Sequence, residues 1–349
     1  MNQVFISGRQ ISEYSKPFIV AEMSGNHNQT LDRALKIVEA AAEAGADAIK
    51  LQTFKPDSMT LNLSNDQFKV NDPQSIWNNQ SLYELYEKAY TPWEWHQPIF
   101  ERCKELGLIA FSSPFDIAAV DFLEELDVPC YKIASFENID HHLVSRVAQT
   151  GKPIIISTGM ATIAEIEETV QVARDSGCEQ LILLKCTSTY PASPENTNIN
   201  TIPHMKQLFQ CQVGLSDHTL GIGTAIASVA LGATFIEKHF TLSRSDGGID
   251  SLFSLEPHEL KNLVQETKRA WLSLGTVKYG PTNDEKKSEK FRRSIYVVED
   301  MKEGEEFTKD NIKVIRPGYG LAPKYYDILL GKKVNKAIKR GTPVTWDLI

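Results

Sequence analysis

The chain has 349 residues, enough for one large domain and a small second one. Hydrophobic residues make up 42% and charged residues 23%, which is the composition of a folded globular protein rather than of a disordered one. The formal net charge of −8 argues against a protein with a broad basic face for nucleic acid.

Eight short apolar runs alternate with longer amphipathic segments between residues 18 and 273. This pattern predicts strands at 18–22, 47–52, 108–113, 130–135, 153–158, 181–187, 212–217 and 234–240. Helices are predicted between most of them, two of them ending at Gly45 and Gly177. Eight such repeats predict an α/β fold, a closed (β/α)8 TIM barrel. An open doubly wound sheet is the alternative, but it usually has fewer strands, and no G-x-G-x-x-G follows the first strand.

The rest of the chain divides at its polar segments. Residues 53–81 form a polar insert after the second strand, where a barrel places its catalytic face; the insert is either a substrate loop or a surface loop without ligand contacts. Residues 276–290 combine Gly, Pro and charges, which predicts a linker between a barrel domain at 1–275 and a module at 291–349. Short apolar pieces in that module (RSIYVVE, IKVIRP, KKVNKAI and TPVTW) predict short strands.

The cysteines and the apolar segments bear on localisation. The five cysteines include no C-x-x-C pair, so we expect buried thiols in a reducing compartment. The N-terminal residues do not have the pattern of a secretion signal, and no apolar run has the length of a membrane span. We therefore expect a cytoplasmic protein with neither a membrane nor a nucleic acid as partner.

Polar side chains follow nearly every predicted strand, where a barrel collects its reacting groups. His218 and His239 lie at the ends of the seventh and eighth strands, which are neighbours in a closed barrel. Two imidazoles could therefore share one Mn, Fe, Co or Zn ion used as a Lewis acid. The alternative is a pair of structural histidines.

Two lysines and four serines lie at the same predicted strand ends: Lys50, Lys132, Ser113, Ser135, Ser188 and Ser216. Cations surrounded by short hydroxyl donors are typical of a site for phosphate or carboxylate. Either lysine could instead be a solvated side chain, or the Schiff-base lysine of an aldolase.

Several segments together carry a family resemblance. They are AEMSGNH (21–27), AGADAIKLQTF (44–54), FSSPFD (111–116), YKIASFE (131–137), STGMAT (157–162), KCTSTYP (185–191), GLSDHTLG (214–221), ALGATFIEKHF (230–240) and RPGYG (316–320). In this order they closely resemble the sialic acid synthase family, over essentially the whole chain. The resemblance implies a TIM barrel followed by a small C-terminal antifreeze-like domain, also called SAF, of the β-clip type.

Three further regions are similar to the pseudaminic acid synthases of that family: SLYELYEKAYTPWEWH (81–96), GGIDSLFSLEP (247–257), and FRRSIY (291–296) with RPGYGLAPKYY (316–326). Where sialic acid synthases usually carry Pro-Gly-Pro-Asp, this chain has Gly-Gly-Ile-Asp. The resemblance implies a transferase that condenses phosphoenolpyruvate with 2,4-diacetamido-2,4,6-trideoxy-L-altrose to give pseudaminic acid, a cell-surface nonulosonic acid, and phosphate. An N-acetylneuraminate or legionaminate synthase, a Schiff-base aldolase and a non-catalytic carbohydrate-binding protein are the alternatives.

The resemblance also implies roles for individual residues. His218 and His239 would hold a divalent metal, expected to be manganese, with magnesium or cobalt as alternatives. Glu22 would act on the attacking water as a general base or acid, or else only orient ligands. The phosphoenolpyruvate contacts would be Lys50, Ser113, Lys132, Ser135, Ser188 and Ser216, and the sugar contacts Gln52, Glu137, Tyr190, Asp250 and Arg316. Arg316 would reach the partner's active site, which predicts a domain-swapped homodimer.

Overall fold

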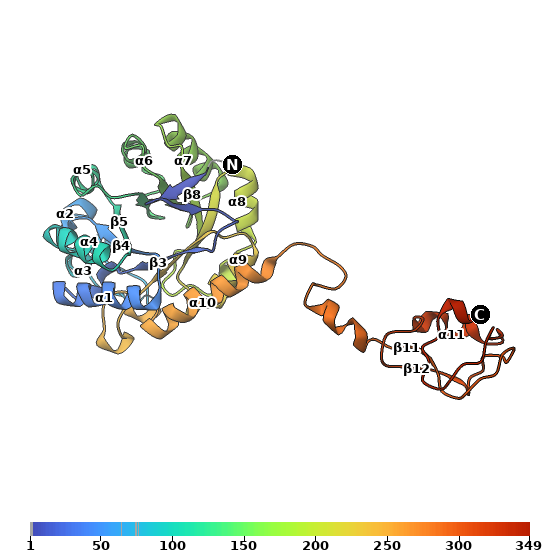
Figure 1. Cartoon of the computed structure of the whole chain (residues 1–349). Helices are drawn as coiled ribbons and strands as arrows, with labels where there is room; N and C mark the ends of the chain where they lie inside the picture. Colours follow the sequence, from blue (N-terminus) through green and yellow to red (C-terminus); the bar gives the residue numbers. More distant parts are fainter. Residues whose placement is uncertain (1–2, 64, 74, 76) are drawn as a thin grey trace. The chain divides into compact units, whose positions relative to one another are not determined.

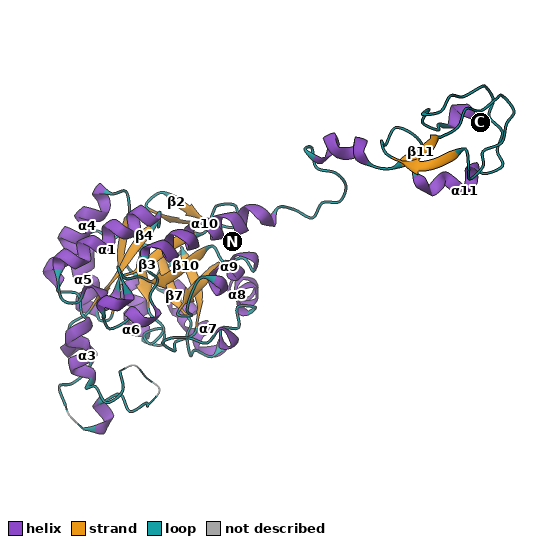
Figure 2. Ribbon diagram, turned by 90° about the horizontal axis from the view of Figure 1, so that it is seen from below, coloured by secondary structure: helices purple, strands orange, loops and turns teal. Residues whose placement is uncertain are grey.

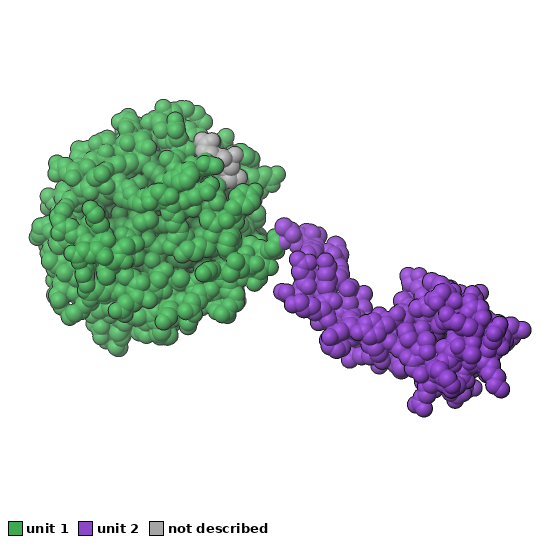
Figure 3. Space-filling view, in the orientation of Figure 1, with its two compact units in different colours: residues 1–275 green, residues 276–349 purple. Residues whose placement is uncertain are grey.

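The computed structural model describes residues 3–63, 65–73, 75 and 77–349. In the polar insert 53–81, residues 64, 74 and 76 therefore lie outside the described residues. The chain divides into two compact units, Met1–Gly275 and Thr276–Ile349, coloured separately in Figure 3.

Eight parallel strands form a closed barrel in the first unit (Figures 1 and 2). In the order of their pairing they are β10 (Phe235–His239), β3 (Phe18–Glu22), β4 (Ala48–Thr53), β5 (Ile109–Pro114), β6 (Tyr131–Ile133), β7 (Ile154–Ser157), β8 (Leu181–Cys186) and β9 (Gln212–Asp217). All eight predicted strands are present, and the closed pairing of β9 with β10 and of β10 with β3 excludes the open sheet.

Helices surround this barrel on its outside (Figure 2). They are α1 (Leu31–Ala44), α2 (Pro56–Met59), α3 (Leu82–Ala89), α4 (His96–Glu105), α5 (Ile117–Glu125), α6 (His141–Ala148), α7 (Ile163–Asp175), α8 (Thr201–Phe209), α9 (Gly223–Ala230) and α10 (Pro257–Leu274). Gly45 ends α1 with a φ of 84°, a left-handed conformation that glycine adopts without strain. A capping box between Thr162 and Glu165 begins α7.

The alternation of side chains along the strands separates two cores. Residues such as Ile19 and Ala21 pack outward against the helices, whereas Phe18 and Val20 belong to a cluster inside the barrel. A short hairpin, β1 (Val4–Ile6) with β2 (Arg9–Ile11), adds its apolar side chains to that inner cluster at the strand starts. Apolar packing therefore fills the amino-terminal part of the barrel interior, and the carboxyl-terminal part is free for polar groups.

The second unit has its own apolar core around Ile295, Phe307 and Val344. Its strands β11 (Ser294–Val297) and β12 (Ile312–Ile315) pair in antiparallel fashion, and α11 (Tyr326–Leu329) follows them. The predicted strands in KKVNKAI and TPVTW are wrong: these segments make only single bridges, because turns interrupt the pairing after one residue. Within the described residues of both units, we find no helix with the length and apolar character that crossing a membrane requires.

Candidate active site

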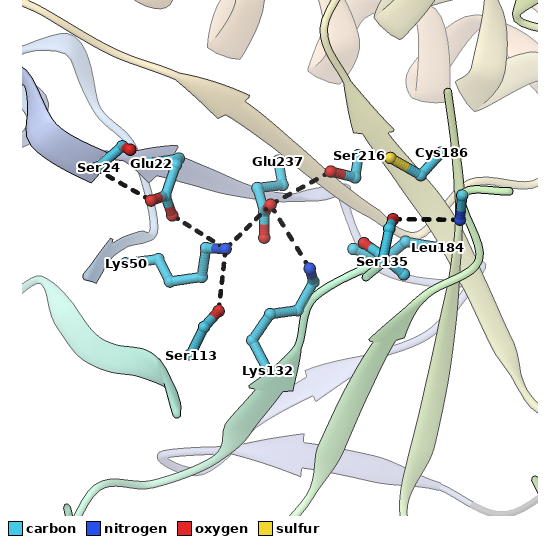
Figure 4. Close-up of polar contacts among 12 residues, drawn as sticks. Glu22, Ser24, Lys50, Ser113, Lys132, Ser135, Leu184, Cys186, Ser216 and Glu237 are labelled. Atoms are coloured by element: carbon cyan, nitrogen blue, oxygen red, sulfur yellow. Dashed lines mark hydrogen bonds and ion pairs between the residues drawn. The ribbon is translucent and has the colours of Figure 1, made fainter. Parts of the chain in front are cut away.

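A network of buried charges joins side chains from four strands of the barrel (Figure 4). The Glu237 Oε1 atom on β10 is 3.2 Å from the Lys50 Nζ atom of β4 and 3.7 Å from the Lys132 Nζ atom of β6. The Ser216 hydroxyl of β9 donates to the same oxygen at 3.2 Å, and Lys50 donates to the Ser113 hydroxyl at 3.3 Å. One carboxylate therefore holds two buried ammonium groups toward the barrel axis.

Glu22, at the end of β3, is the second carboxyl group of this network. Its Oε2 atom lies 3.0 Å from Lys50 Nζ, and its Oε1 atom accepts a hydrogen bond from the backbone N–H of Ser24 at 3.0 Å. Burial raises the pKa of Glu22 to about 7. Burial acts in the same direction on Glu237, but the nearby Lys132 and Lys50 outweigh it and hold the Glu237 pKa well below its usual range. Glu237 is therefore the fixed anion, and Glu22 the carboxyl able to exchange a proton near neutral pH.

The two buried lysines, Lys50 and Lys132, suit the site to binding an anion. Burial lowers the pKa of Lys132 despite the attraction of Glu237. Burial also opposes the charge on Lys50, but the adjacent Glu22 and Glu237 outweigh this effect and raise its pKa. Lys50 and Lys132 both lie near Glu237, and only Lys50 also pairs with Glu22. An anionic ligand at this position would add negative charge beside these two buried ammonium groups.

Two of the predicted serine contacts lie around Gly159, which follows β7. The Gly159 N–H donates to the Ser135 hydroxyl at 3.1 Å. A Cβ atom on Gly159 would come within 2.6 Å of Ser135 Oγ and 2.1 Å of Ser188 Oγ. Only glycine leaves both hydroxyl groups in these positions.

The two predicted metal ligands lie side by side, with ring centroids of His218 and His239 5.3 Å apart. The His218 Nδ1–H donates to the Thr187 carbonyl at 2.9 Å, which leaves its Nε2 lone pair available. Among the described residues, the buried His239 Nδ1 has no hydrogen-bond partner. Because metal–imidazole bonds are about 2.1 Å long, rings at this separation can bind the same ion. The pair therefore fits a divalent metal.

Two of the residues expected at the sugar, Tyr190 and Asp250, lie beside the histidines. The Tyr190 ring packs on His218 with centroids 4.4 Å apart. The Asp250 Oδ2 atom is 3.6 Å from His239 Nδ1 and accepts a hydrogen bond from the Ser24 hydroxyl. Burial raises the pKa of Asp250 to about 6.

Two other predicted sugar contacts belong to the barrel and one does not. Gln52 is half-buried at the end of β4. The Glu137 Oε2 atom is buried without a hydrogen-bond partner among the described residues, and burial raises the pKa of this carboxyl to about 7. Arg316 follows β12 in the second unit, where its side chain is exposed.

Comparison with known proteins shows the family of the chain. The NeuB family model matches residues 37–279, and the SAF domain model matches residues 292–349. The chain belongs to the NeuB family. It is 45% identical to a pseudaminic acid synthase of Campylobacter jejuni subsp. jejuni over 93% of this chain and 94% of that one, and 43% identical to one of Helicobacter pylori over 95% and 97%. The crystal structure of an N-acetylneuraminic acid (sialic acid) synthetase from Leptospira borgpetersenii, in complex with citrate, is 31% identical, with a TM-score of 0.73 over 82% of this chain and 94% of that one.

Family membership confirms the resemblance read from the motifs, but that reading did not single out every residue of this NeuB-family site. Glu237 precedes His239 by two residues, so both side chains point into the barrel, and this spacing was the available signal. Cys186 shares the inward side of β8, with its Sγ atom 3.9 Å from His218 Nδ1 and 3.7 Å from Ser188 Oγ. All five cysteines are free and buried, as expected.

Proposed function

We propose that this NeuB-family chain condenses phosphoenolpyruvate with 2,4-diacetamido-2,4,6-trideoxy-L-altrose, giving pseudaminic acid and inorganic phosphate. The observation that carries the proposal is the position of two buried lysines beside a pair of imidazoles at one barrel mouth. This arrangement suits an anionic donor next to an aldehyde acceptor. The curated relatives named above support this choice of sugar.

The donor is placed against the lysines. Lys50 and Lys132 supply the cations, and the hydroxyl groups of Ser113 and Ser216 border the same charge network. Ser135 and Ser188 add hydroxyl groups on either side of Gly159. Several short donors around two cations suit the phosphate and carboxylate groups of phosphoenolpyruvate.

A divalent metal, expected to be manganese with magnesium or cobalt as alternatives, is assigned to His218 and His239. When bound, such an ion polarises the aldehyde carbonyl of the open-chain sugar. The Thr187 carbonyl holds the His218 ring in the tautomer that such binding requires. Asp250, beside His239, and Tyr190, on His218, are positioned to orient the sugar at the same place.

The bond changes balance without a redox partner. The methylene carbon of phosphoenolpyruvate bonds to the aldehyde carbon, whose oxygen takes up a proton and becomes a hydroxyl group. Water loses a proton as it adds at the carbon that carries the phosphate, and phosphate leaves with cleavage of the carbon–oxygen bond. Glu22 is assigned the role of accepting the proton from that water, because its raised pKa lets it accept a proton near neutral pH. Lys50, 3.0 Å away, stabilises the ionised form of this carboxyl.

Gln52 and Glu137 are assigned to the hydroxyl and amide groups of the sugar. Arg316 is assigned to the active site of a partner subunit in a domain-swapped, cytoplasmic homodimer. Its side chain is exposed and therefore accessible to a ligand. Arg316→Ala should raise the KM for the sugar about tenfold and leave the KM for phosphoenolpyruvate unchanged. An unaltered sugar KM would remove the arginine from the site.

The reaction class is tested by release of inorganic phosphate from phosphoenolpyruvate in the presence of the sugar. Release should stop with a chelator and return with manganese. A Schiff-base aldolase would instead be trapped on a lysine by borohydride with pyruvate, and it would keep its activity after metal removal. Either of those two results would contradict the proposed synthase.

A further inference from the structure

A buried ion pair lies on the helix-facing side of β9 and β10, where the strands otherwise carry apolar side chains. The Lys238 Nζ atom is 2.9 Å from the Asp217 Oδ2 atom, and neither side chain has any exposed surface. Val213 and Leu215 of β9 and Ile236 of β10, which face the same way, belong to the apolar core between the barrel and the helices. Since burying two charges costs free energy that an apolar pair would not, packing alone does not account for this ion pair.

The ion pair is adjacent in the sequence to both proposed metal ligands. Asp217 and Lys238 are opposite each other at the end of the ladder between β9 and β10. His218 follows Asp217, and His239 follows Lys238. The backbone pairing of these two strands therefore ends one residue before the two histidines, whose ring centroids are 5.3 Å apart.

The Lys238 ammonium group connects the two strands beyond the end of this ladder. It donates to the Thr219 carbonyl at 2.6 Å as well as to Asp217 at 2.9 Å. The Asp217 Oδ1 atom in turn accepts a hydrogen bond from the Thr219 backbone N–H at 2.9 Å. One side chain of β10 therefore holds the residues on both sides of His218, and the next residue of its own strand is His239.

The two imidazoles differ in what else holds them. The His218 Nδ1–H donates to the Thr187 carbonyl, which orients that ring. The His239 Nδ1 atom has no hydrogen-bond partner among the described residues, so the backbone of β10 and the packing of nearby rings such as Phe253, 4.9 Å away between centroids, set its position. A shift of β10 along β9 would therefore change the separation of the two rings.

We propose that Lys238 is a positioning residue, which together with Asp217 sets the separation of His218 and His239 and thereby the affinity of the site for its divalent metal. Lys238 faces the surrounding helices, so it acts through the two histidines and contacts neither the metal nor a substrate. Replacing a residue that orients a metal-binding histidine typically weakens metal affinity by about 10- to 100-fold. The inference rests on the metal assigned to the histidines in the proposed function.

The test measures binding of Mn²⁺ alone to the metal-free, full-length protein, from the electron paramagnetic resonance signal that free Mn²⁺ loses on binding. Binding that His239→Ala abolishes is assigned to the histidine pair. Lys238→Met combined with Asp217→Asn leaves no unpaired buried charge and keeps an oxygen for the Thr219 N–H, so the fold should persist. This double variant should raise the Kd for Mn²⁺ at least about tenfold. Asp217→Asn alone keeps the Lys238 bond to Thr219 and should raise the Kd by a smaller factor; it decides the question if the double variant does not fold.

Asp47→Asn is the matched control. Asp47 pairs with Arg9 and accepts a hydrogen bond from the Ile19 backbone N–H at 2.9 Å, but it directly precedes β4, at the end of the barrel where the strands begin. This variant should lose stability and keep the wild-type Kd for Mn²⁺. The inference is overturned if the folded Asp217 and Lys238 variants bind Mn²⁺ as the wild type does, or if Asp47→Asn weakens binding as much as they do. A wild-type protein that binds no Mn²⁺ at the histidine pair would instead refute the metal assignment of the proposed function, and this inference with it.

Discussion

The substitution Glu237→Gln tests whether the buried lysines Lys50 and Lys132 bind an anionic substrate or serve only the stability of the fold. The substitution keeps the shape of the side chain and removes the charge that lies 3.2 Å from Lys50 and 3.7 Å from Lys132. At an effective dielectric constant of about 20, two unit charges 3.7 Å apart interact by about 4.5 kcal/mol. Removing one member of a buried ion pair typically destabilises a protein by about 3–5 kcal/mol.

We expect the free energy of unfolding to fall by about 3 kcal/mol, the lower end of that range. Glu22 still pairs with Lys50 in the variant. Burial also lowers the pKa of Lys132, so this side chain can lose its proton when Glu237 no longer faces it. Both effects limit the loss.

Guanidinium denaturation with and without phosphoenolpyruvate measures the effect. The anionic ligand replaces the missing carboxylate, so it should stabilise Glu237→Gln by about 1.4 kcal/mol more than it stabilises the wild type, which corresponds to tenfold tighter binding. Equal or smaller stabilisation of the variant would refute the assignment of the lysines to the anion.

Asp217→Asn provides a matched control on the neighbouring strand. Asp217 forms an equally buried ion pair with Lys238 at 2.9 Å, and both side chains alternate with the inward-facing residues of β9 and β10. Its loss of stability should be similar in size and should respond to phosphoenolpyruvate as the wild type does.

Four further predictions concern the metal ligand His239, the proton on Glu22 and the serines around Gly159. His239→Ala should lower kcat by at least about a hundredfold while the thermal unfolding curve stays near that of the wild type, since a strand-end ligand is not core packing; retained turnover after metal removal would count against the metal assignment. The pH profile of kcat/KM should rise through an apparent pKa near 7 that is lost in Glu22→Gln. Because the pKa of Glu22 is higher in the folded protein than in the unfolded chain, the unfolded chain loses this proton at a lower pH. The contribution of Glu22 to the free energy of unfolding should therefore weaken as the pH rises from about 4.5 to about 7. A contribution that grew over this interval would contradict the assignment. Gly159→Ala should raise the KM for phosphoenolpyruvate at least about tenfold by displacing two hydroxyl groups, whereas Gly223→Ala, where an added Cβ meets no atom within 4 Å, should not.

The strands and most of the candidate site were predictable from the sequence. Buried parallel strands are mostly apolar runs, and the polar residues within or at the end of such runs can be read from the sequence. Lys50 and Lys132 lie within β4 and β6, and His239 ends β10. The family resemblance rested on the same positions.

The features that could not be predicted depend on contacts between distant parts of the chain, which the spacing of residues in the sequence does not specify. The hairpin at Val4–Ile11 has a two-residue Ser-Gly turn with positive φ at both residues, a recognisable signal, but its packing into the barrel comes from tertiary contacts. Glu237 is recognisable from the sequence as a polar residue near a strand end, but only the folded barrel brings it to two lysines from other strands and so gives it a role. The single bridges in the second unit likewise reflect turns that interrupt otherwise strand-like segments.

The most direct test of the central claim is mass spectrometry of the product formed from phosphoenolpyruvate and a panel of deoxy-diacetamido hexoses and N-acetylmannosamine. We expect a nonulosonic acid with the mass of pseudaminic acid from the L-altrose derivative, with one phosphate released for each product molecule. A product formed from N-acetylmannosamine in preference to that sugar, or formed without phosphate release, would contradict the claim.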